Sequence, residues 1–247
     1  MVEAKRIWFV SDVHITFGDR PYLDQFLTFL DASAKVCDEL YIVGDLFEFW
    51  IGDRQAKIEF YAPLFDKFRE LTAGGLKIKA VHGNRDFLMG KSFSRAGVEM
   101  LPEVIVLELA GKSVHVSHGD QFCIHDLSYQ RARVVMRSYL PRKIAACLPA
   151  FVGVFLAKSY RRISERKKAK KKVKTGNRFH TIEDGLIAEL EKQHFDVIVC
   201  GHIHNYAERE LVVTGKACRV LTTGAWEEEG PNYVDFDGLE LNLCRFG

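Results

Sequence analysis

The chain has 247 residues, 47% of them hydrophobic and 28% charged, and a formal net charge of +2. These values are ordinary for a soluble globular protein with a sizeable core, in one large domain or two small ones. The six cysteines form no CxxC pair and most lie in apolar runs, which gives little support to a zinc finger or a disulfide framework.

The beginning of the chain does not look like a signal peptide, because residues 1–6 run straight into a strand-like apolar segment. The longest apolar run, residues 144–157, is broken by Pro149 and Gly153 and is too short to span a bilayer. We therefore expect a cytoplasmic protein.

Basic residues are concentrated in one segment. Between Arg131 and Lys174 there are fifteen lysines and arginines and a single acid, Glu165. The rest of the chain is therefore acidic, although the net charge of the whole is small. We expect this segment to have a different partner from the remainder of the protein.

The first half of the chain alternates strand-like and helix-like segments. Short β-branched and aromatic runs predict strands, whereas apolar residues recurring every three or four positions predict helices. In chain order we expect a strand at residues 7–10, a helix at 21–35, a strand at 40–43, a helix at 58–71 and a strand at 76–81.

After Pro102 the pattern changes to hairpins. Residues 104–109 and 113–117 flank a turn at Ala110-Gly111-Lys112, residues 196–200 form another apolar run, and two later hairpins turn at residues 214–216 and 237–238. This order favours a two-sheet α/β sandwich over a doubly wound sheet. We expect a single domain over residues 1–247, with an insertion at residues 127–174.

Five of the predicted strands end in residues that commonly bind metal ions. Taken singly, such an Asp is more often a turn residue and such a His more often a structural one. Together they favour one shared site, because functional side chains collect beyond the carboxyl ends of strands in α/β sheets. Asp12 and His14 point to the same side if the first strand continues through them. The candidates are Asp12, His14, Asp45, Asn84, His118, His202 and His204.

Carboxylate, imidazole and amide ligands without a thiolate suit Mn²⁺, Fe²⁺ or Zn²⁺ in a catalytic site. Seven ligands are too many for one ion that keeps an open position, so two ions about 3.5 to 4 Å apart, sharing one carboxylate, fit better. Such a pair activates water and neutralises charge on phosphoryl oxygens. We therefore expect hydrolysis of a phosphate ester or anhydride.

The ordered motifs DxH, GD, GN, H and GHxH resemble the calcineurin-like metallophosphoesterase superfamily, from Asp12 to His204. The resemblance implies that superfamily's two-sheet sandwich and two metal ions that share Asp45. In that arrangement one ion is held by Asp12, His14, Asp45 and His204, and the other by Asp45, Asn84, His118 and His202.

A closer resemblance is to the UDP-2,3-diacylglucosamine hydrolases of bacterial lipid A synthesis. It is carried by the strings YIVGDLFEFWIGD and HGNRDFLMGK, by HGD followed by Asp126 and Tyr129-Gln130, and by GAW at residues 224–226. It implies Mn²⁺-dependent attack of water on the uridine-side phosphorus of UDP-2,3-diacylglucosamine, which gives UMP and 2,3-diacylglucosamine 1-phosphate.

The resemblance also implies roles for individual residues. Asn84, Arg85 and His118 are the expected catalytic residues, and Arg85 stays protonated, so it stabilises phosphoryl charge and cannot act as a base. The expected substrate-binding residues are Asn84, Arg85, Asp126, Lys174 and His202. Two further positions that are Ser and Asn in that family are Lys167 and Lys171 here.

The insertion at residues 127–174 fits an acylated substrate. Its apolar run is framed by basic residues, as expected of a helical lid that receives acyl chains at an anionic membrane surface. We therefore expect the protein to be peripheral on the cytoplasmic face of the inner membrane. The basic run also has a simpler interpretation, as a solvated helix or a disordered loop. The expected apolar stripe is Leu148, Phe151, Val152 and Phe155.

Two alternatives stay open: a metallophosphoesterase acting on another nucleotide, phosphodiester or nucleic acid, and a non-catalytic binding module on the same fold. The basic stretch lacks interleaved aromatic residues for base stacking, so nucleic acid is not the expected partner. We expect the other histidines to be structural or at the surface. Residues that would orient the ligands, or lie in solvated turns, are Glu48, Asp53, Asp86 and Asp120.

Overall fold

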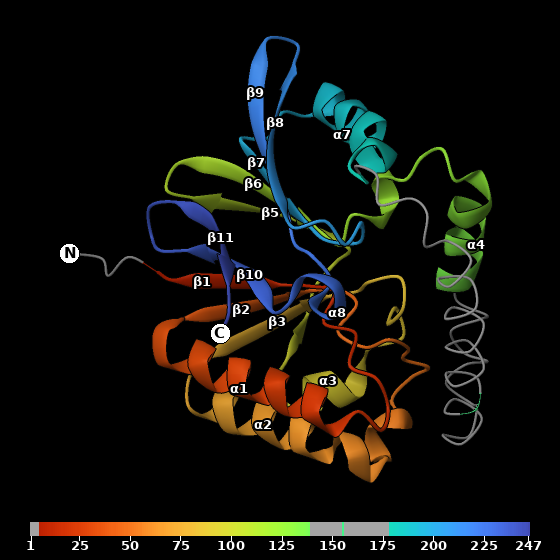
Figure 1. Ribbon diagram of the computed structural model, residues 1–247, viewed down its shortest axis with the longest axis vertical. Coiled ribbons are helices and arrows are strands. Elements are labelled where there is room, and N and C mark those ends of the chain that lie inside the picture. Colours follow the sequence, from red (N-terminus) through yellow and green to blue (C-terminus); the bar gives the residue numbers. More distant parts are fainter. Residues whose placement is uncertain (1–4, 139–154, 156–177) are drawn as a thin grey trace.

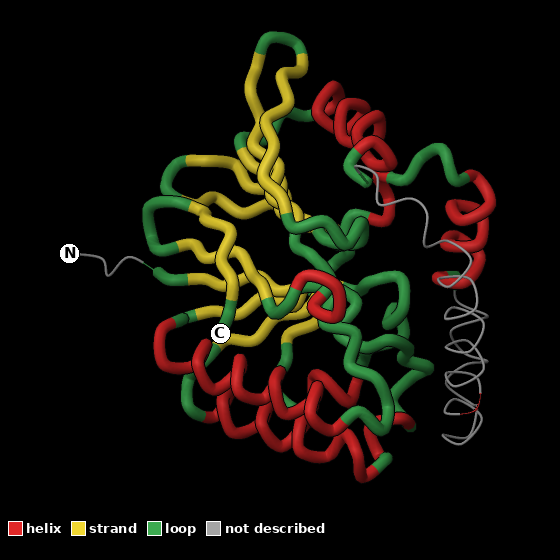
Figure 2. Tube along the Cα trace, viewed as in Figure 1, coloured by secondary structure: helices red, strands yellow, loops and turns green. Residues whose placement is uncertain are grey.

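The computed structural model describes residues 5–138, 155 and 178–247. In this part of the chain two β-sheets pack face to face and helices cover their outer sides (Figure 1). The predicted two-sheet α/β sandwich is confirmed. Figure 2 shows the sheets as two yellow layers, with most helical turns outside them.

The first sheet has the strand order β11-β10-β1-β2-β3-β4. Strands β1 to β4 are parallel, whereas β10 and β11 are antiparallel additions at the β1 edge. The strands are β1 (Ile7–Val10), β2 (Glu39–Val43), β3 (Lys77–Val81), β4 (Glu99–Met100), β10 (Asn232–Phe236) and β11 (Leu241–Arg245).

The second sheet has the order β5-β6-β7-β9-β8, with β6, β7 and β9 parallel at its centre. The hairpins β5–β6, β8–β9 and β10–β11 lie where the sequence predicts them. The strands are β5 (Val104–Leu109), β6 (Lys112–Ser117), β7 (Val197–Cys200), β8 (Ala207–Val213) and β9 (Lys216–Thr222).

The helices are α1 (Arg20–Val36), α2 (Ala62–Ala73), α3 (Lys91–Arg95), α4 (Leu127–Arg137), α7 (His180–Lys192) and α8 (Trp226–Glu229). Residues 55–57, 59–61 and 120–122 form short 3-10 turns. Helix α2 begins later than the predicted residue 58, because Pro63 lacks an N–H and suits the first turn of a helix. Helix α7 was not predicted from the sequence, although Ile182, Leu186 and Leu190 recur at helical spacing and are buried.

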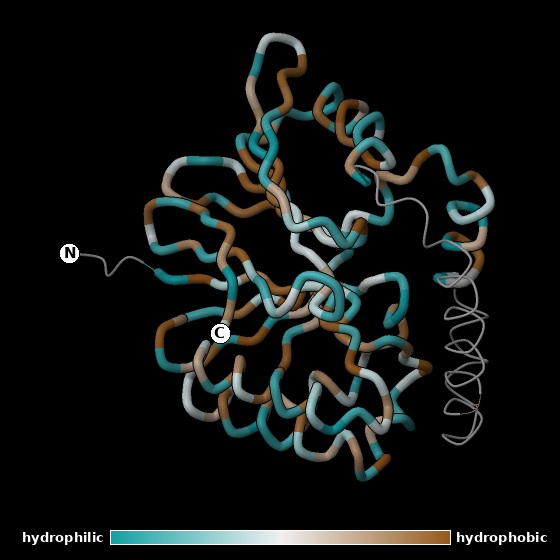
Figure 3. The backbone as a smooth tube through the Cα atoms, viewed as in Figure 1, coloured by the Kyte–Doolittle hydropathy of each residue, from teal (hydrophilic) through white to brown (hydrophobic). Residues whose placement is uncertain are grey.

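Both faces of the central strands are buried, as is usual for parallel strands. In β1, Ile7 and Phe9 pack between the two sheets, whereas Trp8 and Val10 face the layer that contains α1 and α2. Apolar and polar residues alternate along those two helices (Figure 3), which is the pattern of helices with one buried face. The outer face of the second sheet is covered by α7.

Of the insertion predicted at residues 127–174, the structure describes α4, Ser138 and Phe155. Asp126 is the N-cap of α4 and accepts a hydrogen bond from Tyr129 N at 2.9 Å. No helix in the described residues is long and apolar enough to cross a membrane. Leu148, Phe151, Val152, Lys167, Lys171 and Lys174 lie outside the described residues.

Candidate metal centre

All seven candidate ligands lie at the carboxyl ends of strands, and contacts between their side chains connect them into one cluster. Those of β1, β2 and β3 meet at the same edge because these strands are parallel and adjacent. The parallel strands β6 and β7 contribute from the second sheet. The contacts run from His204 to Asp12, His14, Asp45, His118, Asn84 and His202.

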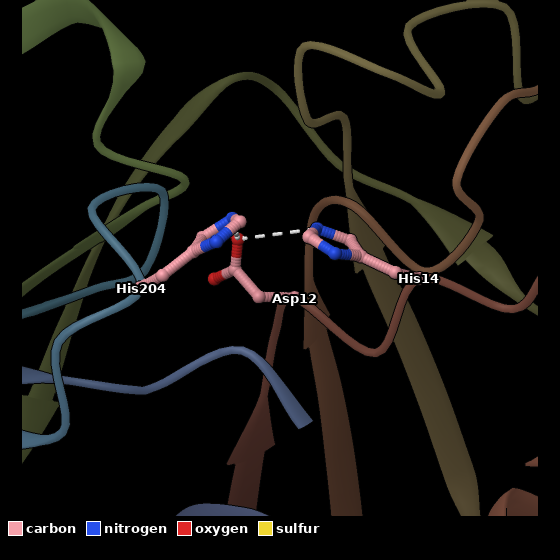
Figure 4. A group of neighbouring side chains, drawn as sticks. All are labelled: Asp12, His14 and His204. Carbon is pink, nitrogen blue, oxygen red and sulfur yellow. Dashed lines mark ion pairs between the residues drawn. The ribbon is translucent and has the colours of Figure 1, made fainter. Parts of the chain in front are cut away.

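One group within this cluster consists of Asp12, His14 and His204 (Figure 4). Asp12 Oδ1 lies 3.7 Å from His14 Nε2 and 3.5 Å from His204 Nε2. In Figure 4 the carboxylate lies between the two imidazole rings. Two atoms that bind one ion at about 2.1 Å are separated by about 3 to 3.5 Å, so the spacing is close to that of ligands around one ion.

A second group surrounds His118. Its Nε2 lies 3.5 Å from Asp45 Oδ2 and 3.0 Å from Asn84 Oδ1. The same amide oxygen is 3.1 Å from His202 Nδ1. His118 Nδ1 donates to Val43 O at 3.1 Å, because a carbonyl can only accept, and Nε2 is therefore the nitrogen directed at the cluster.

In both Asp12 and Asp45, one carboxylate oxygen is held by a backbone N–H group and the other is directed at the histidines. Asp12 Oδ2 accepts from His202 N at 3.0 Å, and Asp45 Oδ1 accepts from Arg85 N at 2.9 Å. The other oxygens, Asp12 Oδ1 and Asp45 Oδ2, face the histidines. Asp45 Oδ2 is 3.5 Å from both His14 Nε2 and His118 Nε2, so one oxygen lies between the two groups.

The backbone at these loops is unusual. Asp12, His14, Asp45, His202 and His204 have positive φ values between 51° and 70°. The first strand therefore does not continue through Asp12 and His14, because a strand requires negative φ. Left-handed residues of this kind cost free energy and gather at functional sites, where the surrounding structure holds them.

Two glycines allow the loops after β2 and β3 to touch. A Cβ on Gly44, which has φ +82°, would lie 2.6 Å from Gly83 Cα. A Cβ on Gly83 would lie 2.2 Å from Asp45 Oδ1. No larger residue fits at either position without moving the carboxylate or the backbone beside it.

The electrostatics of the cluster favour a bound cation. Burial opposes a charge on His14, but Asp12 and Asp45 outweigh it and raise the pKa of His14 to about 9. Burial likewise opposes a charge on His118, but Asp45 and Asp12 raise its pKa to about 10. Asp12 Oδ1 and His14 Nε2 are buried without a hydrogen-bond partner among the described residues. Buried carboxylates that draw protons onto neighbouring imidazoles, and ligand atoms without hydrogen-bond partners, fit a site for divalent metal ions.

Arg85 lies at the edge of the cluster and is held by two carboxylates. Its Nε is 3.3 Å from Asp45 Oδ2, and its Nη1 pairs with Glu48. Glu48 is also 3.9 Å from His14 Nδ1, so this acid contacts both an arginine and a candidate ligand. The Arg85 side chain is only 15% exposed, so its guanidinium is held in one position beside the cluster.

The other acids proposed to orient ligands differ in position. Asp86 is buried and accepts from the backbone N–H groups of Leu46 and Gly83, at 2.7 and 2.8 Å. Burial and the charge of Asp45 raise the pKa of Asp86 to about 7. Asp53 instead bonds to the first residues of α3, with Ser92 N at 2.8 Å, so it belongs to a helix end.

Asp120 connects the loop of His118 to α4. Its Oδ2 accepts from Tyr129 Oη at 2.7 Å, Arg133 Nε at 2.8 Å and Arg137 Nη2 at 3.1 Å. Arg137 also donates to Gly83 O at 3.1 Å. The two arginines were not identified from the sequence, although residues 129, 133 and 137 recur at a spacing of four, which places them on one helix face.

Glu228 and Arg178 were also missed. Glu228 Oε1 lies 3.4 Å from His204 Nδ1, and its Oε2 accepts from Arg178 at 2.8 Å. The hydrogen bond from His204 lowers the pKa of Glu228 to about 2, and Arg178 adds to this effect against partial burial. No periodicity or motif in the sequence places these residues beside the cluster.

The chain is similar to known proteins over most of its length. The model of the calcineurin-like phosphoesterase family matches residues 5–206. The UDP-2,3-diacylglucosamine hydrolases of Salmonella arizonae and Salmonella paratyphi C are each 34% identical to this chain over 239 residues, covering 94% of it and 96% of the relative. Among solved structures, an archaeal phosphodiesterase aligns over 97% of this chain and 98% of its own, with 12% identity and a TM-score of 0.46.

The family model covers most of the chain, and the two hydrolases match nearly all of it at 34% identity. The resemblance inferred from the strand-end motifs is thereby confirmed. The carboxylates and histidines of these motifs lie together in one buried cluster that suits divalent cations. The chain belongs to the calcineurin-like phosphoesterase family and is a metal-dependent hydrolase.

Proposed function

We propose that the cluster holds two Mn²⁺ ions that share Asp45. The support is the position of Asp45 Oδ2, 3.5 Å from His14 Nε2 and equally far from His118 Nε2. When bound, such a pair activates water and neutralises charge that builds up on phosphoryl oxygens. The proposed ligands are Asp12, His14, Asp45 and His204 for one ion, and Asp45, Asn84, His118 and His202 for the other.

The proposed reaction is hydrolysis of the pyrophosphate of UDP-2,3-diacylglucosamine, giving UMP and 2,3-diacylglucosamine 1-phosphate. The observation that carries it is the 34% identity to the UDP-2,3-diacylglucosamine hydrolases over nearly the full length of both chains. Water adds to the uridine-side phosphorus, and the bond from that phosphorus to the bridging oxygen breaks. The bridging oxygen leaves with the sugar phosphate.

The residues proposed to act on the phosphoryl group are Arg85 and Asn84. The Arg85 guanidinium is always charged, and Glu48 and Asp45 hold it at the edge of the cluster. It would stabilise negative charge on the phosphoryl oxygens. Asn84 directs Oδ1 at His118 and His202, which leaves its Nδ2 to donate to the substrate. In this scheme His118 contributes to catalysis as a proposed metal ligand.

The reaction can be tested with purified protein, Mn²⁺ and UDP-2,3-diacylglucosamine in water enriched in ¹⁸O. Mass spectrometry should find UMP that carries one ¹⁸O, and unlabelled sugar phosphate. Label in the sugar phosphate would contradict the proposed site of attack. If the protein cleaved only bis-p-nitrophenyl phosphate, offered in parallel as a simple phosphodiester, it would be a different phosphoesterase.

We propose that residues 127–174 form a lid that binds the acylated sugar and an anionic membrane surface on the cytoplasmic face of the inner membrane. The support among the described residues is α4, whose Leu127, Val134 and Val135 are 63%, 69% and 61% exposed, next to a strongly basic stretch of sequence. Phe155 is 68% exposed. Asp126, Lys174 and His202 complete the proposed substrate contacts.

The membrane proposal is tested by replacing four lysines with glutamine and measuring sedimentation with vesicles that contain anionic lipid. Each basic residue near such a surface contributes about 1 kcal/mol, so binding should fall by more than about a hundredfold. Neutral vesicles serve as the control. Unchanged binding would identify the basic run as a solvated segment. The lysines are Lys167, Lys170, Lys171 and Lys172.

A further inference from the structure

His204 is held between two carboxylates, one at each ring nitrogen. Its Nε2 lies 3.5 Å from Asp12 Oδ1, inside the candidate metal group. Its Nδ1 lies 3.4 Å from Glu228 Oε1, on the opposite side of the ring. An ionised carboxylate can only accept, so Nδ1 is the nitrogen of His204 that donates to Glu228, and Nε2 is the nitrogen directed at Asp12 and the candidate metal group.

Two other histidines of the cluster are held differently, and the Glu48 carboxylate lies 3.9 Å from His14 Nδ1, beyond hydrogen-bond distance. His118 donates from Nδ1 to the backbone carbonyl of Val43, and the side chains of both His118 and His14 are only 1% exposed. The His204 side chain is 12% exposed, and its backbone has φ +51°. A partly exposed ring on a left-handed residue needs a partner to hold one orientation.

Glu228 comes from a part of the fold that is itself fixed. Helix α8 begins at Trp226, whose backbone N–H donates to Asp12 O at 3.1 Å. The indole of Trp226 is buried against Phe26 and Phe29, and its Nε1 donates to Asn232 O at 3.1 Å. The acid beside His204 is therefore carried by a helix anchored both in the core and at the cluster.

Arg178 completes the arrangement. Its Nη1 donates to Glu228 Oε2 at 2.8 Å and to His204 O at 3.3 Å. One guanidinium thus holds both the carboxylate and the backbone of the histidine that the carboxylate contacts. Such a contact restricts Glu228 to the rotamer that reaches Nδ1.

We propose that Glu228 is a positioning residue that fixes the tautomer and the ring orientation of His204 for metal binding, and that Arg178 holds Glu228 in place. This inference rests on the metal centre of the proposed function. A carboxylate behind a ligating histidine also makes the imidazole a stronger ligand, and loss of such a partner weakens metal binding by about 10- to 100-fold.

The test is titration of the metal-free protein with Mn²⁺, followed by electron paramagnetic resonance of the free ion. Glu228→Ala should weaken one of the two binding events by about 10- to 100-fold and leave the other unchanged. Glu228→Gln keeps an acceptor but loses the charge, so its defect should be smaller. Arg178→Ala should weaken the same binding event as Glu228→Ala.

Glu229→Gln is the matched control. Glu229 lies on the same helix, has a similar exposed fraction (36% against 34%) and pairs with Arg245 instead of a candidate ligand. It should bind both ions as the wild type does. Thermal melting of the metal-free variants should show Glu228→Ala fully folded at the temperature of the titration, although loss of its ion pair with Arg178 lowers the melting temperature. This separates positioning from a folding defect.

Histidine tautomers supply a second measurement. Long-range ¹H–¹⁵N spectra of the metal-free protein should show His204 protonated at Nδ1 in the wild type and a mixture of tautomers in Glu228→Ala. Wild-type affinity for both ions in Glu228→Ala, or an unchanged tautomer, would overturn the inference alone. A wild-type protein that binds no Mn²⁺ would overturn the metal centre as well.

Discussion

The ligand-bearing loops and α4 are neighbours, but different forces hold them. Asp12, Asp45 and His118 are at most 1% exposed, and backbone hydrogen bonds fix their loops. Helix α4 exposes Val134 and Val135 and is joined to those loops through charged side chains. Displacement of a ligand loop should therefore stop the chemistry, whereas a change in α4 should alter how the substrate is held.

The largest effect is expected from Asp45→Ala, which removes the oxygen between His14 and His118. Both ions would lose a ligand, so kcat should fall by more than about a thousandfold. Steady-state assays with Mn²⁺ measure this. Turnover close to that of the wild type would contradict the shared carboxylate.

Asp53→Asn is the control for that variant. Asp53 follows the same motif-rich stretch, but the structure places it at the start of α3, where it accepts from Lys91 N and Ser92 N. Asn keeps one acceptor oxygen for these N–H groups, so the change should cost less than about 1 kcal/mol of stability. The variant should nevertheless keep wild-type kcat at 25 °C.

Gly83→Ala tests how little displacement the ligand loops tolerate. The added Cβ would lie 2.2 Å from Asp45 Oδ1, so the carboxylate or the β3 loop must move. A misplacement of about 1 Å near the reacting groups costs about a hundredfold in rate. Gly74→Ala is the control, because the nearest atom to its Cβ would be 3.4 Å away. Equal activity of the two variants would show that the loops are less rigid than their packing indicates.

The pH dependence of metal binding tests the electrostatics of the ligand loops. Asp12 and Asp45 raise the pKa of His14 to about 9 and that of His118 to about 10 against burial, so at pH 7 both rings are protonated without metal. Each must lose its Nε2 proton to bind an ion, so affinity increases with pH. Each ion should bind about tenfold more tightly per pH unit below about pH 8.

Calorimetry in two buffers of different ionisation enthalpy measures the protons released by this binding. The expected value at pH 7 is about one proton for each ion. Binding without proton release would mean that the histidines are neutral before the metal arrives. The carboxylates would then stabilise a cation less than their burial implies.

The same contrast explains what the sequence could predict. Each candidate ligand follows a strand of buried apolar residues, and parallel strands end at one edge, so the cluster can be anticipated from local pattern and topology. The left-handed backbone of Asp12 and His14 could not be predicted from the sequence. It depends on hydrogen bonds to the loop after β2, such as that from His14 N to Asp45 O at 3.0 Å.

The partners of the ligands are harder to predict because they come from distant parts of the chain. Arg178 and Glu228 are 50 residues apart in sequence, and Glu228 is 24 residues from His204. Nothing in the local spacing of these charged residues indicates that they meet. By contrast, Glu48 lies within the same motif as Asp45, and its contact with Arg85 follows from the pairing of β2 with β3.

The smallest effect is expected from Arg133→Ala, which tests α4. Arg133 donates to Asp120 at 2.8 Å and pairs with Glu103 at 2.5 Å, and its side chain is 16% exposed. Its loss loosens α4, while Arg137 still holds Asp120 and Gly83. KM for the acylated substrate should rise by about three- to tenfold, with kcat for bis-p-nitrophenyl phosphate unchanged, because only binding remote from the reacting phosphorus is lost. A parallel loss of kcat with both substrates would mean that α4 also supports the ligand loops, and that the two regions act as one unit.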